Sequence, residues 1–400
     1  MNPTIQRMSD IVWSKFLRMP YGHILDYVAD GAEIRYPSGE ECKNGLPNGL
    51  GWWTPIENGA FYTGLYTYSL IKLYDKEPSE VLENKLKILL NGLFLLQDVA
   101  KVEGFIARGV ARDGKSHYPI SSEDQVVPWV LALYGYLDSK ACCVDKVEVK
   151  TRLLRLLTAL KSHQYCIPTE WENIRHGSWK NSHGFRGVAK LLLLSAILAD
   201  LSRNGDDLED FQKMANEKPD GSPLTRLEII ASGFSHEMIN GYGKQPWICV
   251  ASHFGLHELI KLDGKNADFY RQGLYMNGIT SLMMVNDMKN FTHSDDFSTD
   301  WTPLLRLHRD CGTSIAQNIS LALEQLSYWT NEIVPARVQE HKILGNSVYG
   351  TLIAVTSKNA EIAAAAYKRY SENAKAVQWE KLHLPLAYVA EAIEIMATLQ

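Results

Sequence analysis

The sequence lacks both a long apolar run and a surplus of basic residues. Its longest apolar stretch, LLLLSAILADL at 191–201, is shorter than the roughly 20 residues that a membrane-spanning helix requires. The formal net charge is −5, so the composition offers no electrostatic basis for binding the phosphate backbone of a nucleic acid. We therefore expect a soluble protein that has neither a membrane nor a nucleic acid as its partner.

Signals for export, for metal binding and for nucleotide binding are also missing. The first residues, MNPTIQRMSDIVWSKF, contain no basic stretch followed by an apolar one, so we expect no secretory signal. A trimmed signal would leave the same sequence, so the compartment stays open. The six cysteines form no CxxC pair and no zinc-finger spacing, and we expect reduced or buried thiols. The motifs GxSxG, GxxxxGK(S/T) and GxGxxG are absent, so the serine-hydrolase, P-loop and Rossmann classes lack their signatures. His176 and His183 do not have the i,i+4 spacing of a helical metal pair, and His253 and His257 have no evident third ligand. We therefore expect no metal and no cofactor.

What the sequence does contain is helical periodicity along most of its length. Apolar residues recur at every third or fourth position, which predicts about twelve helices. These cover 4–18, 57–74, 79–100, 123–138, 145–162, 183–203, 224–239, 247–261, 265–288, 311–330, 358–370 and 380–398. The candidate strands at 33–36, 104–107 and 346–356 are short and isolated, and 202–223 is predicted to be an acidic connection. The class is therefore all-α, with short irregular or β-like loop segments.

The predicted helix starts near 57, 123 and 183 are spaced by roughly 60 residues, which is enough for two antiparallel helices and their connections. Thr54 with Glu57, and Ser122 with Gln125, have the spacing of a helix capping box. No linker or low-complexity tract divides the chain, so we expect a single domain over 1–400. Six helical hairpins can close into a toroid, and an open solenoid of hairpins is the alternative.

Four polar segments rich in Trp, His, Tyr and carboxylates lie just before predicted helix starts. They are GWWTPIEN at 51–58, HYPISSEDQVVPW at 117–129, WENIRHGSWKNSHGFR at 171–186 and HSDDFSTDWTP at 293–303. A chain that sets such segments at the same end of successive helices brings them together in space. We therefore expect all four to line one composite pocket.

The segment GLGWWTPIENGAFYTGLYTYSLIKLY opens one predicted inner helix, and HYPISSEDQ opens the next. In this arrangement the chain resembles the six-hairpin glycosidase superfamily over nearly its whole length. The resemblance implies an (α/α)6 toroid whose active site lies where the inner helices begin. Glycoside hydrolases, unsaturated-uronyl hydrolases, polysaccharide lyases and sugar epimerases all occur in this superfamily, so the resemblance does not choose among them. Asp295 and Asp296 are similar to the double aspartate of toroids that cleave α-mannan, but the flanking residues differ, so no role is carried over.

The acids of these segments are the candidates for catalysis. Asp124 lies in the first turn of a predicted helix, where the dipole keeps a carboxylate ionised and suits it to act as a base or nucleophile. Capping is the structural alternative for Asp124 and for Glu57. Two acids from different hairpins would form the pair that glycoside hydrolysis requires. The candidates are Asp124, Glu57 and one of Asp295, Asp296 and Asp300.

The remaining candidates are expected to bind substrate. Indole faces stack on pyranose rings, while amide and cationic groups donate hydrogen bonds to sugar hydroxyls and carboxylates. At least one of Trp52 and Trp53 is expected to be a wall of the protein rather than a stacking platform. The set comprises Trp52, Trp53, Asn58, His117, Tyr118, Glu123, Arg175, His176, Trp179, His183 and Trp301.

These residues predict a carbohydrate-active enzyme, a glycoside hydrolase whose partner is an oligosaccharide, with uronic acid as a candidate component. The first alternative is a polysaccharide lyase, in which Tyr118 or His117 removes a proton beside a uronate while Asn58 or Arg175 neutralises the carboxylate. A sugar epimerase and a non-catalytic glycan-binding protein remain open as well. The sequence does not address the oligomeric state.

Overall fold

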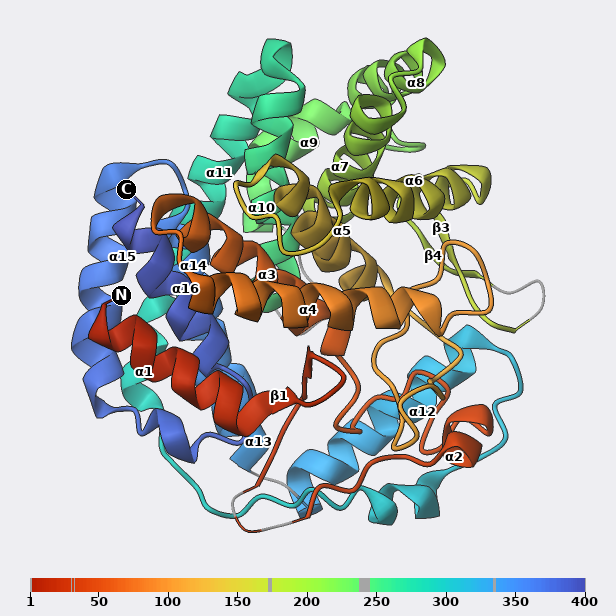
Figure 1. Cartoon of the computed structure of the whole chain (residues 1–400), viewed down its shortest axis with the longest axis vertical. Helices are drawn as coiled ribbons and strands as arrows, with labels where there is room; N and C mark the ends of the chain where they lie inside the picture. The colour runs from red at the N-terminus through yellow and green to blue at the C-terminus, as the bar shows by residue number, and fades with distance from the viewer. Residues whose placement is uncertain are drawn as a thin grey trace.

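The computed structural model describes residues 2–29, 31, 33–171, 175–236, 245–333 and 336–399. Helices dominate this part of the chain (Figure 1). The strands form two short antiparallel hairpins, β1 (Leu17–Arg18) with β2 (His23–Ile24) and β3 (Cys166–Pro168) with β4 (Arg175–Ser178). In the first hairpin Leu17 lies opposite Ile24. The predicted all-α class is confirmed.

One set of helices packs side by side in the centre of the molecule. Each of these helices contacts the next in chain order, and the last returns to the first. They are α3 (Gly59–Lys76), α5 (Glu123–Asp138), α7 (Phe185–Ser202), α10 (Pro246–Leu262), α14 (Asn346–Val355) and α16 (Ala387–Thr398). Their residues are buried on most faces, as expected for helices that are apolar all round. We call these the inner helices.

A second set of helices covers the inner ones. In order of the inner helices from α3, these are α4 (Glu80–Asp98), α6 (Lys146–Ser162), α8 (Gly205–Asn216), α11 (Ala267–Leu282), α15 (Ala360–Asn373) and α1 (Pro3–Ile11). Because α1 packs on α16, the two ends of the chain lie on the same side of the molecule (Figure 1). The remaining α-helices are α2 (Gly39–Lys43), α9 (Arg226–Ser232), α12 (Ile315–Tyr328) and α13 (Ala336–Val338).

Inner helices α3 and α5 approach each other closely at a glycine. A Cβ atom built on Gly64 would lie 2.5 Å from the carbonyl carbon and oxygen of Pro128. Only a residue without a side chain fits at this crossing. None of the described helices combines the length and the apolar character that crossing a membrane requires.

Most predicted helices are present within a few residues of their expected bounds. The inner helices begin at 59, 123, 185 and 246, so the spacing near 60 residues extends to a fourth helix. The strand prediction for 346–356 is wrong, because this segment is the inner helix α14. Its apolar residues are buried all round, so the sequence shows no period of 3.6 residues there. The predicted connection at 202–223 contains the helix α8, and neither 33–36 nor 104–107 forms a strand.

Both predicted capping boxes are wrong. Helix α3 begins at 59, and the Thr54 hydroxyl donates to the carbonyl of Gly51 at 2.7 Å. Ser122 precedes α5 without a side-chain capping bond. The Gln125 side chain instead reaches α3, where its carbonyl oxygen accepts from the Phe61 N–H at 3.2 Å. Of the side chains expected to form these boxes, Gln125 thus joins two neighbouring inner helices.

Candidate functional site

A cavity of about 400 Å³ opens where four inner helices begin, which is a volume typical of small-molecule sites. Three of the four polar segments meet in it, from before α3, from the start of α5, and from β4 to the start of α7. The start of α10 and a residue of α12 complete the wall. The lining residues are Trp52, Glu57, Asn58, Arg108, Ser122, Glu123, Asp124, Ile167, His176, Gly177, Ser178, Trp179, Ser182, Arg186, Gly187, Trp247, Ile248 and Ile319.

Glu57 enters the cavity wall because the chain turns sharply before it. Trp53 has a φ of 72°, and its N–H donates to Glu57 Oε2 at 2.7 Å. A non-glycine residue at positive φ is strained, typically by about 1–3 kcal/mol, so surrounding contacts must hold it. Here the Trp53 indole N–H donates to the carbonyl of Ala322 at 2.8 Å. The strained turn thus fixes the position of the Glu57 carboxylate.

Asp26 lies directly behind Glu57. The Asn58 side-chain amide donates to Asp26 Oδ1 at 2.8 Å and to Glu57 Oε1 at 3.1 Å, so one NH2 group joins both carboxyl groups. The hydroxyl of Tyr62 also donates to Asp26 Oδ1, at 3.2 Å. Burial and the neighbouring charge of Glu57 raise the pKa of Asp26 to about 8. Asp26 therefore carries a proton at neutral pH.

Opposite this pair, a network of four charges forms at the starts of α5 and α7. Asp124 Oδ1 lies 2.8 Å from Nζ of Lys190, whose side chain is fully buried. Glu123 Oε1 lies 3.4 Å from the same Nζ and 3.2 Å from Nε of Arg186. Burial would raise the pKa of Asp124, but the charges of Lys190 and Arg186, with that of Arg108, outweigh it and lower the pKa. Asp124 is therefore ionised at neutral pH.

Arg108 and His176 are held by consecutive backbone carbonyls. Arg108 Nε donates to the Ile120 carbonyl at 3.0 Å, and His176 Nδ1 lies 2.8 Å from the Ser121 carbonyl. A carbonyl oxygen only accepts, so Nδ1 carries the hydrogen and Nε2 of the neutral ring is an acceptor. None of the described residues donates a hydrogen bond to this Nε2. Burial lowers the pKa of His176, which keeps the ring neutral.

Three tryptophans give the cavity its aromatic surface. Trp52 and Trp247 are partly buried, whereas Trp179 is almost fully buried and its indole N–H has no hydrogen-bond partner among the described residues. Trp53 packs edge-on against Trp52, with ring centroids 5.7 Å apart, and does not line the cavity. Of this tandem pair, Trp52 lines the cavity and Trp53 is buried behind it.

Several predicted binding residues lie outside the cavity. His117 pairs with Glu170 through Nε2 at 2.8 Å, and the buried Tyr118 ring fills the space beside Gly51. His183 is exposed on the surface before α7. Arg175 belongs to strand β4, but its side chain lies outside the described residues. Some of the polar residues in these segments, such as His117 and Tyr118, therefore stabilise the fold and do not line the cavity.

The fourth segment, 293–303, does not line the cavity, so the expectation of a four-part pocket is corrected. Trp301 is fully buried in a cluster with Trp53 and Trp329, and its indole N–H donates to the carbonyl of Arg35 at 2.8 Å. Asp300 Oδ1 accepts from the N–H of Thr302 at 2.9 Å and caps a short turn. The exposed acids of this segment, Asp295, Asp296 and Asp300, lie outside the cavity. Trp301 thus packs with Trp53 in the core and does not reach the cavity.

The sequence did not predict several residues of the site, among them Asp26, Arg108, Lys190 and Trp247. The sequence could have indicated Lys190, because it is the one charged residue after Arg186 in the apolar segment FRGVAKLLLLSAILA. A lone charge in such a segment suggests a buried ion pair. Trp247 lies at the start of an inner helix, as Glu123 does. Asp26 stands in the irregular segment HILDYV and left no periodic signal.

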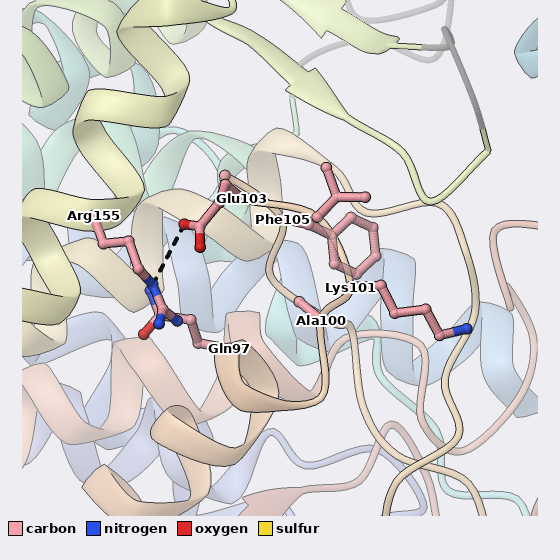
Figure 2. A pocket seen from close by; sticks show the side chains of 8 residues that line it. Gln97, Ala100, Lys101, Glu103, Phe105 and Arg155 are labelled. Atoms are coloured by element: carbon pink, nitrogen blue, oxygen red, sulfur yellow. Dashed lines mark ion pairs between the residues drawn. The ribbon is translucent and has the colours of Figure 1, made fainter.

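Two smaller hollows carry less chemistry. One, of about 20 Å³, adjoins the cavity through Trp247 and lies at the starts of α14 and α16, beside His341 and Tyr349. The other, of about 60 Å³, lies at the surface between α4 and α6. Figure 2 shows Glu103 and Arg155 facing each other across it, 3.4 Å apart, while Lys101 points away. This hollow contains an exposed ion pair, and none of the predicted site residues lines it.

The described residues include no group of three or more His, Cys, Asp or Glu side chains that could hold a metal ion. All six cysteines are free thiols. No protein-family model, no curated protein and no solved structure matches the chain. The function therefore rests on the geometry of the cavity itself.

Proposed function

We propose that the protein is a carbohydrate-active enzyme on an (α/α)6 toroid, and that it hydrolyses a glycosidic bond in an oligosaccharide. The cyclic contacts of the inner helices support the toroid, as does the pairing of each with an outer helix. The cavity and the small hollow beside Trp247 together touch the starts of all six inner helices. In the proposed toroid, both hollows would lie at the same end of the ring, where they share Trp247.

A single observation carries the enzymatic proposal. Glu57, from before α3, and Asp124, from the start of α5, line one cavity together with Trp52 and Trp179. Hydrolysis of a glycoside requires one acid that donates a proton and one ionised partner. Aromatic faces provide the stacking surface for the sugar ring. The two acids, the indole rings and the volume of the cavity all fit an oligosaccharide substrate.

In this proposal Asp124 is the ionised partner and Glu57 is the proton donor. Asp124 takes a proton from water as the water oxygen bonds to the anomeric carbon. Glu57 gives its proton to the leaving glycosidic oxygen as the bond between that oxygen and the anomeric carbon breaks. Solvent then returns a proton from Asp124 to Glu57. Asn58, joined to both Glu57 and Asp26, fixes the orientation of the donor.

Release of reducing ends from a panel of oligosaccharides tests the proposal. On a substrate found in this way, Glu57→Gln and Asp124→Asn each lower kcat/KM by roughly 100- to 10,000-fold, as expected for loss of general acid or base catalysis. Asp296→Asn is the matched control, because this exposed acid from the fourth segment lies outside the cavity, and it keeps wild-type turnover. Full activity in both cavity variants would remove the assignment.

The free Nε2 of His176 favours a second candidate, β-elimination from a uronate. Nε2 would take the proton from the carbon beside the carboxylate as the glycosidic C–O bond breaks and a carbon–carbon double bond forms. The leaving oxygen would receive a proton from Glu57. The product carries an unsaturated uronide that absorbs in the ultraviolet, whereas hydrolysis of a saturated substrate creates no such band. A protein that binds glycans without releasing reducing ends or unsaturated products would be a non-catalytic lectin.

A further inference from the structure

Arg108 lines the cavity without forming an ion pair to any carboxylate that the structure describes. Arg186 and Lys190 form ion pairs with Glu123 and Asp124, and Arg337 lies 3.9 Å from Glu57 Oε2. Arg108 makes no ion pair with any described carboxylate. Its Nε and one terminal nitrogen donate to the carbonyls of Ile120 and Glu57, at 3.0 and 3.2 Å. The other terminal nitrogen has no hydrogen-bond partner among the described residues.

The guanidinium of Arg108 is buried, with only 2% of the residue exposed. Burial lowers the pKa of Arg108, and the nearby carboxyl groups of Glu57, Asp124 and Asp26 oppose that shift. None of the described carboxylates, however, lies within ion-pair distance of Arg108. A buried charge without a partner is costly, and an anion that enters the cavity relieves that cost.

We propose that Arg108 binds the carboxylate of a uronic acid residue of the substrate, with His176 accepting a hydroxyl of the same sugar ring. The inference rests on the proposed function and narrows its substrate class to acidic oligosaccharides. Both side chains are held by consecutive carbonyls, of Ile120 and Ser121, so the free guanidinium nitrogen and the free Nε2 are positioned before any ligand arrives. A carboxylate and a neighbouring hydroxyl on one pyranose ring present the matching acceptor and donor.

Pairs of oligosaccharides that differ only in charge test this subsite. Galacturonan, glucuronan, alginate and hyaluronan oligosaccharides are each compared with their carboxyl-reduced forms, which keep the linkages but are neutral at the reduced positions. Isothermal titration calorimetry measures binding to the full chain. We expect at least one acidic chain to bind roughly 10- to 100-fold more tightly than its reduced form, the range of a charge-assisted hydrogen bond.

Substitutions then test whether Arg108 causes the preference for acidic over carboxyl-reduced chains. Arg108→Gln abolishes it while leaving the affinity for the reduced chain nearly unchanged, and Arg108→Lys retains most of it. Arg112→Gln is the matched control, because Arg112 belongs to the same loop but is exposed and outside the cavity, and it leaves the preference intact. Circular dichroism checks that each variant is folded.

The possible outcomes separate the two proposals. If reduced chains bind as tightly as acidic ones, or if folded Arg108→Gln keeps the preference, the acidic subsite is refuted while the glycan site stands. If no chain of either kind binds, both proposals fall. Because the wild-type comparison needs no substitution, an unfolded Arg108→Gln variant does not prevent a decision.

Discussion

Replacing Lys190 with methionine removes the charge that lies closest to Asp124. Lys190 is fully buried in α7, and its Nζ lies 2.8 Å from Asp124 Oδ1. Methionine has a similar length and is apolar, so packing in the helix is largely kept. The Asp124 carboxylate, however, then stays in the cavity wall without its nearest partner. Breaking a buried pair in this way typically costs about 3–5 kcal/mol.

The structure places the expected loss at the lower end of that range, at about 3 kcal/mol. Glu123 retains Arg186 at 3.2 Å, so the loss falls mainly on Asp124, whose side chain is 17% exposed and partly solvated. Lys190→Met combined with Asp124→Asn leaves no unpaired charge, so we expect the double variant to be more stable than Lys190→Met alone by about 1–2 kcal/mol.

The pH dependence of this loss follows from the pKa of Asp124. Burial would raise that pKa, but Lys190, Arg186 and Arg108 outweigh it and lower the pKa in the folded protein. A lowered carboxyl pKa stabilises the folded state fully above the unfolded pKa of about 3.9, and this contribution is lost as the pH falls through the folded-state value. The difference between wild type and Lys190→Met is therefore largest near neutral pH and shrinks in acid.

Urea unfolding followed by circular dichroism measures these differences at pH 7 and at pH 3, below the unfolded pKa of a carboxyl group. Lys87→Met is the matched control, because Lys87 is an exposed lysine on the outer helix α4, and its midpoint should stay within error of wild type. Wild-type stability of Lys190→Met, or a double variant less stable than the single one, would refute the pairing argument.

Two further predictions concern the core. Burial raises the pKa of Glu391 to about 8. Its Oε2 accepts from the Tyr66 hydroxyl at 2.9 Å, while Oε1 has no hydrogen-bond partner among the described residues. Wild type therefore loses stability as the pH rises from about 4.3 toward 8, whereas Glu391→Gln shows a flatter profile in urea unfolding between pH 6 and pH 9. Gly64→Ala drives a methyl group into the carbonyl of Pro128 and lowers the free energy of unfolding by roughly 1–3 kcal/mol, while Gly205→Ala, with open space around it, is neutral or slightly stabilising. Equal unfolding midpoints for the two alanine variants would contradict the close crossing of α3 and α5.

The sequence predicted the helices because their signal is local. Spacing of apolar residues along 123–138 and 145–162 is sufficient to locate α5 and α6, and the spacing near 60 residues implied repeated hairpins. The same reasoning failed at 346–356, where burial on every face erases the amphipathic pattern. A helix that is surrounded by protein has no polar face, so a search for amphipathic periodicity does not detect it.

For the site, the sequence by itself determined that 51–58, 117–129 and 171–186 carry acids and indoles at the starts of helices, and those segments share one cavity. Only the tertiary structure decided that 293–303 turns away, because burial of Trp301 against Trp53 depends on a contact between distant segments. It also decided that Asp26 stands behind Glu57, and that Lys190 in α7 pairs with Asp124 in α5. Helix formation follows from neighbours in the chain, whereas the charge and protonation of a site follow from neighbours in space.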